Sequence, residues 1–191
     1  MTFQQQPHVH RINPADLELE RRFVHRLTPH TKRMRLLAAF GEPSEAQLIR
    51  LVSPDPDTEL ALAWLQNPLS KSRSESVGEF AAVARYALVD LERRIGEFAI
   101  VVADEFQGQG MGRKLMHALI SAARQADLEG LQGDCYADNR ALISLCESLG
   151  FELNAHPEDA TLMRVNLALS PFLKVGMQAK GAHTEHHTCY Q

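Results

Sequence analysis

The stretch from Glu97 to Arg113 constrains the fold of this chain more than any other. Its sequence is EFAIVVADEFQGQGMGR, in which an apolar strand passes directly into a turn with three glycines within five residues. A helix follows, with apolar residues at the three-to-four spacing of a helix packed on a sheet. Such a junction leaves backbone N–H groups without helical partners at the positive end of a helix dipole. The sequence therefore predicts an anion site there, for a phosphate or pyrophosphate.

Two familiar phosphate-binding turns do not fit this glycine turn. A P-loop needs Lys-Ser/Thr after its last glycine, and the turn has none. The pattern Gly108-x-Gly110-x-Gly112 is one residue short of the Rossmann fingerprint. A plain helix start is the remaining alternative. Each glycine within a helix costs about 1 kcal/mol of propensity, so close approach of a ligand to the backbone is the favoured reason for them.

The patterning of the whole chain predicts the order β-α-α-α-β-β-β-α-β-α-β-β, a mixed α/β sandwich. Asn13 before Pro14 and Ser44 before Glu45 are expected to cap helices. Gly130 is expected to stop the long helix and Gly150 the next one. Residues 1–170 are predicted to form one domain and 171–191 a flexible tail. The strands are expected at 8–12, 59–65, 80–89, 98–102, 131–137, 151–155 and 161–169.

Composition excludes several classes of function. The net charge of −4 and pI near 6.1 give no basis for binding nucleic acid or an anionic membrane. No apolar run is long enough to span a bilayer, and the N-terminus lacks the pattern of a secretory signal. The three cysteines form no CxxC pair, so a cytoplasmic, reducing setting is expected. His183, His186, His187 and Cys189 cluster near the C-terminus, but without apolar residues to organise a site no metal is predicted.

Three segments together resemble the GNAT (Gcn5-related) N-acetyltransferases: Gln107–Gly112 after its strand, Asn139–Leu145, and Leu149-Gly150-Phe151. The resemblance covers residues 8–169 and implies the GNAT fold, a central, mixed, mostly antiparallel sheet flanked by helices. Residues 97–104 and the His-Pro-Glu-Asp turn at 156–159 look most like the acetyltransferase domain of bacterial Pat-type protein lysine acetyltransferases. The acyl-CoA-synthetase-like and cyclic-nucleotide-binding parts that some of those relatives carry are not in this sequence.

The resemblance implies acetyl-CoA as the acyl donor. Backbone N–H groups from Gly108 to Arg113 would hold the pyrophosphate, and the Gln107 side chain would support that loop. A bulge after the strand would leave amides unpaired, while Asn139 would bond the pantetheine amide. The donor-binding residues so implied are Ile100, Val101, Val102, Gln107, Gly108, Gln109, Gly110, Met111, Gly112, Arg113 and Asn139.

Glu97 is the candidate general base. Lysine amines have a pKa near 10.4, so the acceptor must lose a proton before it attacks a thioester. Glu97 is expected to start the strand on the face shared with Ala99 and Val101, partly desolvated and with a raised pKa. The alternative from the residues alone is a solvated charge at a strand end; the Pat-type resemblance favours the base. A backbone amide near Ile100 to Val102 would stabilise the oxyanion.

Other residues carry secondary expectations. Cys146 stands where many GNAT enzymes have a tyrosine that protonates the leaving thiolate, and it is interpreted as a packing residue rather than an acid. Asp104 is expected to shape the turn through local backbone bonds, and Arg113 and Lys114 to meet CoA phosphates. Residues 16–52 and 67–76 are expected to build the acceptor groove.

The predicted function is acetylation of a primary amine, with a protein lysine as acceptor; an acyl-CoA synthetase is one target that the resemblance suggests. Two alternatives stay open. One is acetylation of a small amine or a protein N-terminus, and the other is a non-catalytic CoA-binding sensor.

Overall fold

The computed structural model describes residues 8–36, 43–66 and 78–169. The predicted tail at 171–191, its histidine cluster and the 67–76 loop lie outside these residues. Within them, no helix combines the length and the apolar character needed to cross a membrane. The predicted cytoplasmic location stays a prediction.

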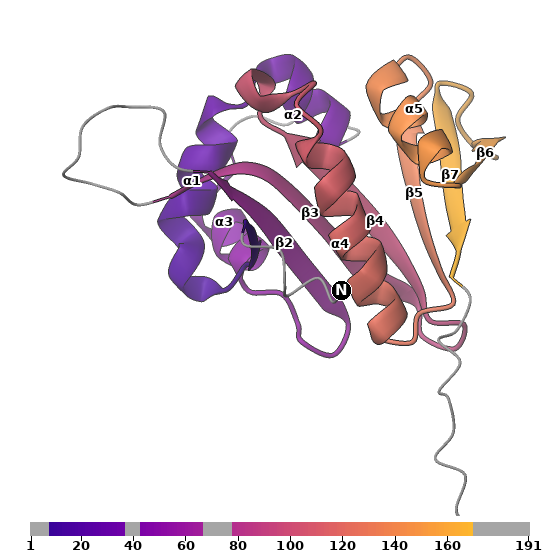
Figure 1. Cartoon of the computed structure of the whole chain (residues 1–191), viewed down its shortest axis with the longest axis horizontal. Helices are drawn as coiled ribbons and strands as arrows, with labels where there is room; N and C mark the ends of the chain where they lie inside the picture. The colour runs from indigo at the N-terminus through magenta and orange to yellow at the C-terminus, as the bar shows by residue number, and fades with distance from the viewer. Residues whose placement is uncertain (1–7, 37–42, 67–77, 170–191) are drawn as a thin grey trace, which may run out of the picture.

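A seven-stranded sheet forms the centre of the molecule, in the order β1-β2-β3-β4-β5-β7-β6 (Figure 1). Every neighbouring pair is antiparallel except β4 with β5, which is parallel. The predicted mixed, mostly antiparallel sheet is therefore confirmed. The strands are β1 Val9–Arg11, β2 Glu59–Gln66, β3 Glu79–Asp90, β4 Ile95–Val102, β5 Gly130–Tyr136, β6 Glu152–Ala155 and β7 Leu162–Ala168.

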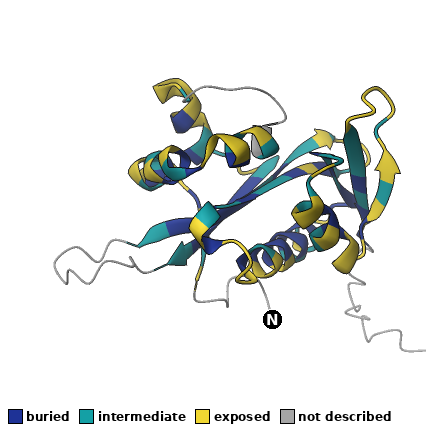
Figure 2. Ribbon diagram, turned by 90° about the horizontal axis from the view of Figure 1, so that it is seen from above, coloured by how far each residue is buried: buried dark blue, intermediate teal, exposed yellow. Residues whose placement is uncertain are grey.

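Helices cover both faces of the sheet (Figures 1 and 2). Helices α1 (Leu17–Arg26), α2 (Pro29–Leu36) and α3 (Glu45–Val52) lie on one face, and α4 (Met111–Gln125) and α5 (Arg140–Ser148) on the other. Short 3-10 turns, η2 (Pro14–Asp16) and η3 (Asp104–Phe106), precede α1 and the glycine turn. The predicted element order is confirmed.

Both predicted N-terminal caps are present. The Asn13 side chain accepts from Ala15 N at 3.0 Å, and Ser44 accepts from Gln47 N at 3.3 Å. Both sites form complete capping boxes, which satisfy backbone donors that the helices leave open. The prediction for Gly130 is wrong, because this glycine is the first residue of β5. Asp127, with φ of 55°, takes the left-handed conformation after α4 instead.

The apolar core lies between the sheet and the helices on either face, as the buried residues in Figure 2 show. One ion pair is buried in it: Glu20 of α1, with 0% exposure, lies 3.6 Å from Arg85 of β3. Arg85 also donates to Leu51 O of α3 at 3.3 Å. This pair therefore joins the central strand to both α1 and α3.

Strands β4 and β5 pair only along part of their length. Residues 95–97 of β4 pair with 130–132 of β5, and beyond that point the described strands separate toward the end where α4 begins (Figure 1). At the joint, Gly133 leaves no room for a side chain: a Cβ there would lie 2.9 Å from Phe98 Cε1 and 3.1 Å from Phe98 O. Strand β4 begins at Ile95 rather than Phe98, so Glu97 lies inside the paired part.

Candidate active site

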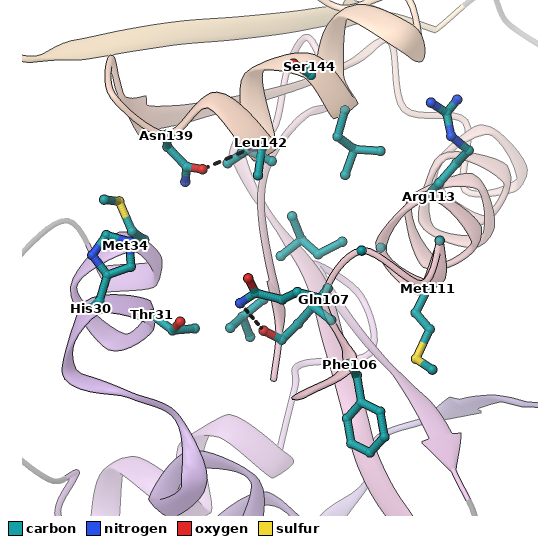
Figure 3. Close-up of a pocket in the computed structure, with 18 residues that line it drawn as sticks. His30, Thr31, Met34, Phe106, Gln107, Met111, Arg113, Asn139, Leu142 and Ser144 are labelled. Carbon is teal, nitrogen blue, oxygen red and sulfur yellow. Dashed lines mark hydrogen bonds between the residues drawn. The ribbon is translucent and has the colours of Figure 1, made fainter. Parts of the chain in front are cut away.

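A cleft of about 470 Å³ opens where β4 and β5 separate. All the predicted donor-binding residues except Gln109 line it. Figure 3 shows the glycine turn and α4 on one side, α5 on another, and α2 across from them. The lining residues that sequence reasoning missed are His30, Thr31 and Met34 of α2, Phe106, and Ala141, Leu142, Ser144 and Leu145 of α5.

The glycine turn exposes backbone toward this cleft. Gly108 and Gly110 have φ of 73° and 78°, and nothing lies within 4 Å of where a Cβ would be built on either. Gly110 is the N-cap of α4, and no side chain among the described residues caps it. The first N–H groups of α4 are therefore available to an anion, and the dipole favours negative charge there. This cradle fits a pyrophosphate.

Side chains of the turn hold it to the strand before it. Gln107 Nε2 donates to Val102 O at 3.1 Å, which closes the turn on the last residue of β4 (Figure 3). Gln109 Nε2 donates to Glu105 O at 2.9 Å. Of the two cations after the glycines, only Arg113 lines the cleft. Lys114 Nζ instead lies 5.4 Å from the centre of the Trp64 ring.

Backbone groups of β4 also face the gap. Ala103 N donates to Ala81 O of the β3 side at 2.9 Å. Because N–H groups alternate between the two edges of a strand, those of Ile100 and Val102 face the β5 side, where the described ladder has ended. The expected bulge is absent there: the β3–β4 register is unbroken from Val102 to Gly96. The separation of the strands, not a bulge, opens these amides.

Asn139 has two functions available on one side chain. Its Oδ1 accepts from Leu142 N at 3.2 Å and so caps α5 (Figure 3). The carbonyl oxygen is committed to the helix, and the Nδ2 group is left to donate into the cleft that Asn139 lines. Asn139 can therefore bond a ligand carbonyl without giving up its cap.

Glu97 lies beside a smaller hollow of about 70 Å³. Met34, Ile100 and Leu142 line both this hollow and the larger cleft, so the two adjoin. Asp134 contributes a second carboxylate, while Ala99 and Val165 add apolar wall. The expected desolvation of Glu97 is wrong, because its side chain is exposed where the strands separate.

A polar cluster lies near Glu97, on β5, β7 and the β6–β7 turn. Arg164 makes a two-bond contact with Asp134, at 2.8 and 2.9 Å, and its Nη2 lies 3.0 Å from His156 Nε2. The hydrogen bond to Asp134 raises the pKa of Arg164 despite partial burial, and the charges of Asp134, Glu97 and Glu158 add to it. Glu97 is therefore close enough to the positive charge of Arg164 for the two to interact.

The expected local bonds are only part of the contacts of Asp104. Its backbone oxygen accepts from Gln107 N at 3.3 Å within the turn, but its carboxylate accepts three hydrogen bonds from the start of α2. Thr28 N donates at 3.1 Å, Thr28 Oγ1 at 3.0 Å and Thr31 Oγ1 at 2.7 Å. Asp104 thereby joins the segment after β4 to a helix more than 70 residues earlier in the chain.

Cys146 is fully buried, at 0% exposure, and does not line the cleft. Burial, with a smaller contribution from Cys135, raises the pKa of its thiol to about 12. A thiol so placed is a poor proton donor to a leaving group at neutral pH, which favours the packing interpretation. Among the described residues, no group of three or more His, Cys, Asp or Glu side chains is arranged to hold a metal.

A strand, an open glycine turn and a helix start that no described side chain caps surround a cleft beside a parallel strand pair, an arrangement suited to a phosphate-bearing ligand. The model of the Acetyltransferase (GNAT) family matches residues 39–151. The chain belongs to the GNAT family. Members of this family use acetyl-CoA as donor, and this GNAT chain is accordingly an acetyltransferase.

Individual GNAT relatives agree with this assignment. An acetyltransferase of Pseudomonas aeruginosa is 32% identical over 158 residues, which cover 83% of this chain and 81% of the relative. An L-methionine sulfoximine/L-methionine sulfone acetyltransferase of Salmonella typhimurium is 32% identical over 106 residues, covering 52% and 62%. Among solved structures, the GNAT domain of S. lividans PAT superposes with a TM-score of 0.73 at 20% identity, covering 84% of this chain and 89% of that one. The last likeness shows a shared fold.

Proposed function

We propose that this protein transfers an acetyl group from acetyl-CoA directly to a primary amine, with a protein lysine as the favoured acceptor and Glu97 as the general base. The proposal rests on one observation, the hollow that adjoins the cleft at Met34, Ile100 and Leu142. Its walls are apolar, and Glu97 and Asp134 add carboxylates. An amine at the end of an aliphatic chain suits such a surface.

The residues divide the chemistry between them. Acetyl-CoA supplies an activated thioester carbonyl. The glycine turn and the first turn of α4 would bind its phosphates, and Asn139 Nδ2 would donate to the pantetheine arm. Glu97, being exposed, would take the amine proton through a water that it holds. The Ile100 N–H, which faces the gap, would donate to the oxygen that gains charge.

Two observations support other functions. The name of the Salmonella typhimurium relative specifies amino acid derivatives as acceptors, which favours a small α-amine as the second candidate. A non-catalytic CoA sensor is the third reading, since Cys146 replaces the usual tyrosine. The acceptor site is the point on which these readings differ.

The test measures CoA release with three acceptors: lysine peptides, free amino acids and peptides with a free N-terminus but no lysine. We expect release with lysine peptides and a fall in kcat of roughly 100-fold or more for Glu97→Gln. The acetyl-CoA Kd should stay unchanged, because Glu97 lies outside the phosphate cradle. The matched control is Glu92→Gln, an exposed carboxylate in the β3–β4 turn that lines neither the cleft nor the hollow.

Each outcome decides between the readings. If Glu97→Gln is as active as wild type between about pH 6 and pH 9, the assignment of the base is wrong. Release with amino acids alone would favour the second candidate. Tight acetyl-CoA binding without release to any amine would favour the sensor.

A further inference from the structure

Three consecutive residues after β4 hold the corner between α1 and α2. We call residues 26–31 the α1–α2 corner. Arg26 Nε lies 3.4 Å from a Glu105 oxygen, and the Arg26 guanidinium lies 5.4 Å from the centre of the Phe106 ring. Asp104 takes the three hydrogen bonds from Thr28 and Thr31. The corner is thus fixed to the segment that joins β4 to the glycine turn.

Asp104 makes the most directional of these contacts. Thr28 Oγ1 accepts from Thr31 N at 3.2 Å and so caps α2, while its own hydroxyl donates to Asp104. The carboxylate therefore lies at the N-terminus of α2, where the helix dipole favours negative charge. Thr31 is buried, at 7% exposure, so its bond to Asp104 is shielded from water. Hydrogen bonds to a charged group in such a setting are the stronger kind.

The ionisation of Asp104 agrees with this geometry. Burial acts to raise the pKa of its carboxyl, but the hydrogen bonds from Thr31 and Thr28 outweigh it, and the pKa lies below its ordinary value. The carboxylate is thus charged throughout the neutral range, when the three bonds are formed.

Helix α2 is the wall that these bonds hold in place. His30, Thr31 and Met34 line the donor cleft opposite the glycine turn, and Met34 also lines the hollow beside Glu97 (Figure 3). The donor cradle itself depends on backbone conformation and on Gln107. A change at Asp104 should therefore move the α2 wall and leave the cradle in place.

We propose that Asp104 is a positioning residue for the reaction: it fixes α2 to the end of β4 and so sets the space in which the acceptor amine meets Glu97. The assignment of α2 to the acceptor rests on the proposed function. Asp104 contacts neither substrate, and it acts through Thr28 and Thr31.

The test compares Asp104→Asn with wild type in three measurements. These are the acetyl-CoA Kd, the KM and kcat for a lysine peptide, and hydrogen–deuterium exchange of the α2 amides at residues 30–36. We expect faster exchange in α2 and a KM for the peptide raised about tenfold, from the loss of charge-assisted bonds. The acetyl-CoA Kd and kcat should change by less than about threefold. A merely structural role would instead raise the acetyl-CoA Kd along with the KM, and would lower kcat and the melting temperature.

Two further variants keep the result interpretable. Thr31→Val removes one donor at nearly constant volume and should change KM in the same direction by less. The double variant should add little to Asp104→Asn, because both remove the same bond. Asp55→Asn is the matched control, since Asp55 also bonds a nearby backbone N–H, that of Asp57 at 3.0 Å, but lies before β2.

The inference and the proposed function fail in different ways. An unchanged KM, or an acetyl-CoA Kd weakened as much as the KM, overturns the role of Asp104. If wild type acetylates no amine, the proposed function fails. The exchange measurement alone then tests whether Asp104 holds α2 in place. Faster α2 exchange with an unchanged acetyl-CoA Kd then supports Asp104 as the residue that holds α2, and unchanged exchange overturns it.

Discussion

The glycine turn and the α1–α2 corner lie on opposite sides of one cleft, yet different contacts hold them. The turn owes its shape to neighbours in the chain: two glycines with positive φ, the Gln107 bond to Val102 O, and a helix that starts without a side-chain cap. The corner is held by side chains from residues 104–106, far along the sequence. The conformation of the turn is thus locally encoded, and the position of the corner is a product of tertiary packing.

Introducing a negative charge at position 110 should have the largest effect, and it tests whether the glycine turn binds an anion. Gly110→Asp and Gly110→Asn both suit a left-handed position with open space beside it, so they differ in charge alone. We expect Gly110→Asp to bind acetyl-CoA roughly 10- to 100-fold more weakly than Gly110→Asn, because a carboxylate repels phosphate at close range. Isothermal titration at two salt concentrations measures this. Equal affinities would mean that no anion is bound at the turn.

Two substitutions at Asn139 distinguish its role as a helix cap from its proposed role in binding the ligand. Asn139→Asp keeps an oxygen that caps α5 but loses the Nδ2 donor, so the melting temperature should hold while acetyl-CoA binds about tenfold more weakly. Asn139→Ala loses the cap as well and should cost about 1 kcal/mol of stability. Thermal unfolding and titration of both variants give the comparison. If Asn139→Asp binds acetyl-CoA as wild type does, the side chain serves only the helix.

Cys146 should give the smallest effect on the reaction. With the thiol buried and its pKa at about 12, Cys146→Ala should change kcat by no more than about twofold. A large fall in kcat, steeper at high pH, would instead identify the thiol as the acid for the leaving group.

The same thiol has a predictable effect on stability. Burial raises its folded-state pKa above the ordinary value for a thiol, so its contribution to stability is fully present below about pH 9 and is lost as pH rises toward about 12. The gap in unfolding free energy between wild type and Cys146→Ala should therefore narrow over that interval. Urea unfolding at several alkaline pH values measures it, and a constant gap would contradict the buried, protonated thiol.

The contrast between the turn and the corner also explains which features of the fold and the site can be predicted from the sequence alone. Periodicity and caps at Asn13 and Ser44 predict element order, because these signals act within a few residues. For the same reason the sequence predicts that Gln107, Gly108 and residues 110–113 line the cleft. No short-range signal links Asp104 to Thr31, so the sequence suggested a local role for this residue. The exposure of Glu97 likewise depends on where β5 separates from β4, which neither strand encodes alone.

The close packing at Gly133 means that a single added carbon atom would disturb the joint between β4 and β5. A methyl group there would meet the Phe98 backbone oxygen, which cannot swing aside as a side-chain tip can. The two parts of the sheet, β1–β4 and β5–β7, would have to move apart at this joint. Substitution of Gly133, which does not line the cleft, should thus displace the β4–β5 joint itself by a few tenths of an ångström.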